Sequence, residues 1–75
     1  MNEEIARAVR DRLPDAEVTA AVDGNRALIT VISPTFAGMS RVAKQQAVYA
    51  CIDHLIQDGT LHAVTIRALT PDEHA

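Results

Sequence analysis

One histidine stands out among the residues whose chemistry could support a function. His62 follows a turn at Gly59 and opens an alternating segment that reads as a strand. A neutral imidazole binds iron and zinc well, and a ligand at the start of a strand would be held rigidly while still reaching solvent. The other interpretation is a histidine at the rim of the core, hydrogen-bonded to backbone. From the residues alone, this structural interpretation is favoured.

A second pair of metal-ligand types lies on one predicted helix. Cys51 and His54 are spaced i, i+3, so both side chains could contact one ion. Cys51, however, falls within the apolar stripe of that helix, and free cysteine is usually buried. We therefore predict that Cys51 belongs to the core and that His54 is solvated. As the single cysteine, Cys51 excludes an internal disulfide and fits a reducing compartment.

Polar residues crowd the first turns of the same helix. Arg41, Lys44 and Gln45 form either a solvated helix face or a contact surface for a partner or for phosphates. The loop before them, Gly38-Met39-Ser40-Arg41, lacks the second glycine of the G-x-x-G loop with which KH domains grip RNA. The net charge of −3 also contrasts with the basic stripe of most nucleic-acid binders. A DNA contact through the helix stays open as the weaker alternative.

Signs of catalysis, secretion and membrane insertion are missing from the sequence. Ser33 and Ser40 lack a G-x-S-x-G context, and no Walker loop or cysteine pair occurs. A chain of 75 residues has a thin core with little room for a deep pocket. Glu3 and Glu4 occupy the place of a basic signal-peptide region, and no apolar run approaches the roughly 18 residues of a membrane span. We expect a cytoplasmic protein that is not an enzyme.

The elements that must position these residues follow from periodicity and from turn residues. Together they predict one α+β domain over residues 1–75, with the order α-β-β-α-β and a short C-terminal turn. Two helices can cover only one face of the three-stranded sheet. The expected segments are a helix over 2–13, strands over 17–22 and 26–33, a helix of about 18 residues that begins after the cap Ser40, and a strand over 61–69.

Two of these segments carry strong local signals. Asp23-Gly24-Asn25 is a turn between the first two strands, because Gly and Asn tolerate positive φ. At the other end, Thr70-Pro71-x-Glu73 predicts a capped helix start, with Glu73 completing a capping box. In the last strand His62, Val64, Ile66 and Ala68 should share one side. The more polar alternate set should be solvated, and it consists of Ala63, Thr65, Arg67 and Leu69.

Four motifs taken together resemble the BolA family, in particular its short, acidic IbaG-like branch. The resemblance covers residues 3–73 and implies a fold similar to a type II KH domain. The motifs are Phe36-x-Gly38-Met39-Ser40-Arg41-Val42, Lys44-Gln45-Gln46-x-Val48-Tyr49, His62-Ala63-Val64 and Thr70-Pro71-x-Glu73.

The resemblance implies a function that the residues alone do not give. It implies a module that pairs with a monothiol glutaredoxin in 2Fe–2S cluster binding, trafficking, or iron and stress sensing. His62 would be a cluster ligand, and the glutaredoxin cysteine and glutathione would supply thiolates. The alternative is a transcription regulator that binds nucleic acid through the helix starting at Ser40, with contacts from Arg41, Lys44 and Gln45. A homodimer is also left open.

One position departs from the family pattern. Related chains place a second ligand, His or Cys, in or just after the hairpin turn, where this chain has Arg26. Arginine stays protonated and does not ligate metal. Three outcomes follow: His62 holds the cluster with a weaker further ligand, the protein binds the glutaredoxin without stabilising a cluster, or Arg26 pairs with an acidic partner.

Overall fold

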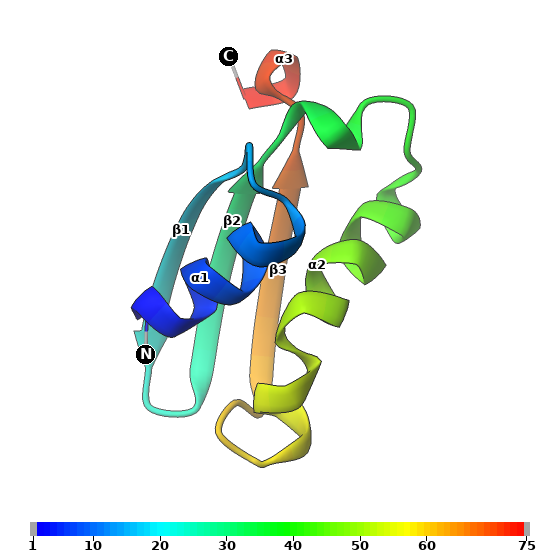
Figure 1. Cartoon of the computed structure of the whole chain (residues 1–75). Helices are drawn as coiled ribbons and strands as arrows, with labels where there is room; N and C mark the ends of the chain where they lie inside the picture. The colour runs from blue at the N-terminus through cyan, green and yellow to red at the C-terminus, as the bar shows by residue number, and fades with distance from the viewer. Residues whose placement is uncertain (1, 75) are drawn as a thin grey trace.

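The computed structural model describes residues 2–74, apart from the side chain of His74, as three helices, one 3₁₀ turn and a three-stranded sheet (Figure 1). This arrangement confirms the predicted α+β order. The elements are α1 (Asn2–Arg12), β1 (Glu17–Asp23), β2 (Arg26–Ile32), η1 (Pro34–Phe36), α2 (Arg41–Gln57), β3 (Ala63–Leu69) and α3 (Pro71–His74).

The sheet has the order β1-β2-β3, with β2 in the centre. β1 and β2 form an antiparallel hairpin, whereas β2 and β3 are parallel. A parallel pair needs a long crossover, and here η1 and α2 provide it. α1 and α2 lie against the same face of the sheet (Figure 1), as predicted. The sheet therefore has one covered face and one open face.

Local sequence explains where these elements begin and end. Gly24 adopts φ +60° in the two-residue turn between β1 and β2, a conformation that glycine allows at little cost. At the start of α2, the Ser40 hydroxyl accepts a hydrogen bond from the Ala43 N–H at 3.1 Å, which confirms the predicted cap. At its other end, Gly59 adopts φ +85°, the left-handed conformation typical of a residue after a helix.

The core between helices and sheet is aliphatic, with one aromatic side chain. Phe36, which η1 turns inward, is 1% exposed. The predicted stripe of α2 is confirmed, because Val48, Cys51, Ile52 and Leu55 are buried and Ile56 packs against them. β2 alternates strictly, with its buried side chains at Ala27, Ile29 and Val31. In residues 2–74, no helix is long and apolar enough to cross a membrane.

The last strand begins two residues later than predicted, at Ala63 rather than at 61. Leu61 is instead a core residue, 1% exposed, whose N–H donates to the Leu55 carbonyl. His62 lies in a bend and is exposed, whereas Val64 is half-buried and Ile66 and Ala68 are buried. Residues 61 and 62, which periodicity assigns to the strand, belong instead to the connection between α2 and β3. This connection packs Leu61 into the core.

Candidate functional site

His62 sits where two segments distant in sequence meet. Its backbone N–H donates to the carbonyl oxygen of Asn25 at 2.8 Å, and the Ala63 N–H reaches the same oxygen at 3.3 Å. Asn25 belongs to the turn between β1 and β2, so one carbonyl ties the start of β3 to the hairpin. The result is an exposed imidazole on a backbone that the sheet holds in place. This geometry suits a ligand presented to a second molecule.

Arg26 lies at the same end of the sheet as His62. In the parallel register of β2 and β3, Arg26 is the Cα partner of Ala63, the residue after His62. Its antiparallel partner is Asp23, so these three positions form the last row of the sheet. All three are exposed. The structure thus brings together His62 and the position at which the family pattern expects a second ligand, although the arginine there cannot serve as one.

Among the side chains of residues 2–73, no group of three His, Cys, Asp or Glu is placed to hold a metal ion. Cys51, as predicted, is buried, and its Sγ lies 3.3 Å from the Ala47 carbonyl oxygen. Burial raises the pKa of the Cys51 thiol, and the nearby Arg12 guanidinium offsets this only in part. A thiol kept protonated is a poor metal ligand. His54 is exposed, so this pair is divided between core and solvent.

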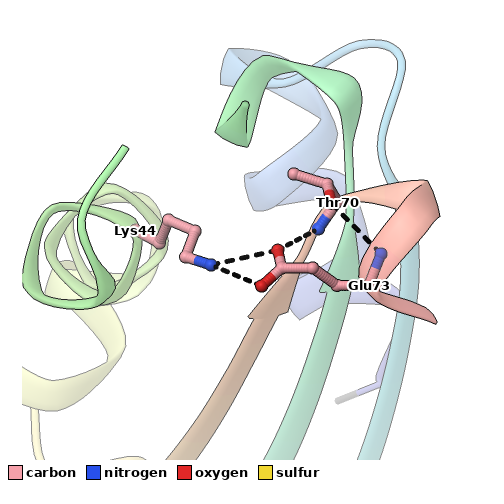
Figure 2. Close-up of polar contacts among 3 residues, drawn as sticks. All are labelled: Lys44, Thr70 and Glu73. Atoms are coloured by element: carbon pink, nitrogen blue, oxygen red, sulfur yellow. Dashed lines mark hydrogen bonds and ion pairs between the residues drawn. The ribbon is translucent and has the colours of Figure 1, made fainter. Parts of the chain in front are cut away.

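Two of the three predicted contact residues of α2, Lys44 and Gln45, are engaged within the protein. The Lys44 Nζ lies 3.1 and 3.3 Å from the two carboxylate oxygens of Glu73 (Figure 2). The Gln45 side chain donates from Nε2 to the Ile66 carbonyl oxygen at 2.6 Å. Arg41, by contrast, is exposed at the first turn of the helix. Their role as a partner or nucleic-acid contact stays a prediction.

Glu73 has two tasks. Its carboxylate accepts a hydrogen bond from the Thr70 N–H at 2.9 Å, while its own N–H donates to the Thr70 hydroxyl at 3.3 Å. This reciprocal pair confirms the predicted capping box. The Thr70 N–H, and after it the Lys44 ammonium, lowers the pKa of Glu73. The carboxylate therefore stays charged at neutral pH and ties α3 to α2 (Figure 2).

These contacts border a groove that sequence reasoning missed. The α2–β3 groove is lined by Arg41, Lys44 and Gln45, by residues 66–69 of β3, and by Glu73. Arg67, an exposed residue of β3, is a second arginine that borders this groove. The sequence pattern places Arg67 only on the solvated side of its strand and assigns Glu73 only to a cap. Lys44 and Glu73 are 29 positions apart in the sequence, so no local pattern reveals their pairing.

Comparison with known proteins gives a consistent result. The family described as BolA-like protein matches residues 8–73. The chain is 40% identical to acid stress protein IbaG of Escherichia coli strain K12 over 74 residues, which are 99% of this chain and 88% of the relative. A solved BolA protein homologue from Coxiella burnetii superposes with a TM-score of 0.83 at 27% identity, covering 99% and 95% of the two chains. The BolA domain of SufE1 from Arabidopsis thaliana shares the fold, with a TM-score of 0.85 at 22% identity over 96% and 93%.

Proposed function

Because the chain belongs to the BolA-like protein family, in its IbaG-like branch, we propose that it is a binding module that pairs with a monothiol glutaredoxin. The pair would hold a 2Fe–2S cluster between them for trafficking or for iron and stress sensing. The E. coli relative is named an acid stress protein, which supports the stress role. His62 would be the ligand that this chain contributes, and the fold would serve to present it.

The position of His62 carries this proposal. Its imidazole is exposed, whereas its backbone is anchored to Asn25 across the start of the parallel strand pair. A histidine retained for packing would be expected to lie against the core, as its neighbour Leu61 does. Because the backbone is already anchored, mainly the imidazole side chain would lose conformational entropy when a partner arrives. This is the property that a shared metal site requires.

The donor set fits a shared site and not a resident one. A 2Fe–2S cluster needs four ligands, usually thiolates, and imidazole in place of thiolate raises its reduction potential. Among residues 2–74, the end of the sheet that holds His62 and Asn25 offers one imidazole and no thiolate, since Cys51 is buried in the core. The glutaredoxin cysteine and glutathione would supply the thiolates. When bound, the cluster would supply one-electron redox chemistry.

Arg26 would have a role other than ligation in such a complex. Arg26 is exposed and lies in the last row of the sheet beside Ala63, the residue that follows His62. Asp23, its cross-strand neighbour, is the acidic residue of that row. A guanidinium here is suited to a carboxylate brought by the partner or by glutathione. This chain would therefore contribute one ligand and one positive charge at the same edge.

Anaerobic reconstitution tests the proposal. This protein, a monothiol glutaredoxin, glutathione, iron and sulfide are combined, and visible absorption and circular dichroism are recorded. The expected result is a spectrum distinct from that of the glutaredoxin homodimer, which His62→Ala abolishes and His54→Ala preserves. A stable complex that has the spectrum of the glutaredoxin homodimer, or that has no cluster spectrum, would show that the module binds its partner without metal.

A nucleic-acid-binding regulator is the second candidate. Its support is the pair of exposed guanidinium groups, Arg41 and Arg67, beside the α2–β3 groove. Against it, Lys44 is already paired with Glu73 and Gln45 with the Ile66 carbonyl. Phosphate contacts would make the affinity strongly dependent on salt. Titration with duplex DNA at low salt tests this candidate. If the protein does not bind the duplex, the candidate is dismissed.

A further inference from the structure

The α2–β3 groove lies at the opposite end of β3 from His62. Six residue steps separate Ala63 from Leu69, which in a strand is about 20 Å. Figure 1 shows α3, at the Leu69 end, and the loop between α2 and β3, at the other end, far apart. The groove is therefore a second surface, independent of the site proposed for the cluster.

The outer edge of β3 borders this groove. Within residues 2–74, β3 pairs only with β2, so its other side has no strand neighbour there. The Leu69 carbonyl faces β2, where it accepts the Ser33 N–H at 3.0 Å. Backbone groups alternate in direction along a strand, so those of Ile66 and Ala68 face outward. The Gln45 side chain occupies the Ile66 carbonyl, and Ala68 presents its N–H and C=O to the groove edge.

The charge of the groove is opposite to that of the whole chain. Arg41, Lys44 and Arg67 contribute three positive charges, and Glu73 contributes one negative charge, whereas the chain carries a net charge of −3. The Lys44 side chain is only 12% exposed, and its ammonium lies 3.1 Å from a carboxylate oxygen. Glu73 thus marks the place where a carboxylate fits in this groove.

We propose that the α2–β3 groove binds an extended, acidic segment of a partner protein, with a carboxylate of that segment replacing Glu73 on Lys44. The backbone of the segment would add to the outer edge of β3 at Ala68, the mode of recognition in which a peptide extends a sheet. Arg41 and Arg67 would bind further carboxylates of the same segment. Glu73, held in place by Thr70, acts as a built-in competitor that keeps the groove closed to weakly acidic chains.

Four features favour a peptide over single-stranded nucleic acid. The groove has no aromatic residue in its lining on which a base could stack. The anionic group that Lys44 already binds is a carboxylate, and this single lysine forms the ion pair with it. A run of phosphates would also meet the net negative charge of the remaining surface. An extended peptide satisfies the open edge of β3, which a sugar-phosphate chain cannot do in register.

The test uses the full chain and a synthetic octapeptide in which glutamate alternates with threonine. Binding is followed by amide NMR shifts. The expected shifts are confined to residues 41–45 and 66–73. Glu73→Gln should tighten binding by about threefold, because it removes the competing charge, and Lys44→Gln or Arg67→Gln should weaken it by about as much. Arg10→Gln, the same charge change on α1, should leave the affinity unchanged.

Two control ligands make the proposal refutable. The octapeptide with glutamine in place of glutamate should bind more weakly, and an eight-nucleotide oligothymidylate should not shift the groove residues. No shift with the acidic peptide for either wild type or Glu73→Gln would overturn the proposal. Tighter binding of the oligothymidylate would also overturn it, by assigning the groove to nucleic acid. Glutaredoxin is absent throughout, so neither result bears on the role of His62.

Discussion

The backbone N–H of His62 donates a 2.8 Å hydrogen bond to the carbonyl oxygen of Asn25, which joins the start of the last strand to the turn of the hairpin. The two residues lie 37 positions apart in the sequence. The bond is made by backbone atoms, so it does not depend on the side chain at either position. Substitutions of His62 should therefore change the exposed site without loosening the edge of the sheet.

A histidine in place of Arg26 should strengthen the shared cluster. Arg26 stands in the last row of the sheet beside Ala63, so Arg26→His would bring a second imidazole to the edge that carries His62. The expected result is slower loss of visible absorption from the reconstituted complex in air. Arg67→His, which adds the same side chain on β3, is the matched control and should have no effect. Equal rates of loss for wild type and Arg26→His would refute the assignment of this edge.

Neighbouring residues of β2 should differ sharply in their effect on stability. Ile29 is fully buried, so Ile29→Val should lower the free energy of unfolding by about 0.5–1.5 kcal/mol. Leu28, on the open face, is 44% exposed, and even Leu28→Ala should change the free energy of unfolding by less than about 0.5 kcal/mol. Urea denaturation measures both. A larger loss for Leu28→Ala would mean that the open face is covered in solution.

Cys51 should react slowly in the folded protein. Its thiol is buried, and burial raises its pKa, so little thiolate forms at neutral pH. Alkylation by iodoacetamide, followed by mass spectrometry, should be slow in buffer and should become fast in concentrated urea. Equal rates in the two conditions would show that the thiol is accessible in the native state, and would reopen Cys51 as a metal ligand.

The link between α3 and α2 should depend on pH with a defined sign. The pKa of Glu73 lies below its ordinary value of 4.5, through the Thr70 N–H first and then through Lys44. A lowered pKa means that the stabilising contact is fully present above the ordinary value and is lost as the pH falls through the lower, folded value. The Thr70 amide shift should therefore titrate with a midpoint below 4.5.

Two variants check this assignment. Glu73→Gln should flatten the titration of the Thr70 amide, whereas Lys44→Gln should raise the midpoint only in part, because the Thr70 hydrogen bond persists. High salt should act like Lys44→Gln, since the ion pair is partly exposed to solvent. A wild-type midpoint at or above 4.5 would contradict the pairing of Glu73 with both residues.

Much of the fold could be predicted from sequence because its signals are local. The cap at Ser40, the glycine after α2 and the capping box of Thr70 and Glu73 each lie within a few residues of the structure they specify. The start of β3 was misplaced because apolar alternation continues through Leu61, which tertiary packing draws into the core. Periodicity does not distinguish a strand residue from a buried connector.

The sites could be predicted only in part. His62 was found from its motif, and its anchoring to Asn25 depends on the parallel register of two strands, which sequence does not give. Arg41, Lys44 and Gln45 were grouped because they follow one another along a helix. Their separate partners, Glu73 for Lys44 and the Ile66 carbonyl for Gln45, come from segments that α2 meets only after folding.

The central claim, that His62 ligates a cluster shared with a glutaredoxin, is tested most directly by pulsed EPR of the reduced complex. This chain alone is labelled with ¹⁵N-histidine, so any ¹⁵N coupling must come from His54, His62 or His74. We predict a strong ¹⁵N hyperfine coupling that persists in His54→Ala and His74→Ala and disappears in His62→Ala. A reduced complex without such a coupling, or one unchanged in His62→Ala, would contradict the account.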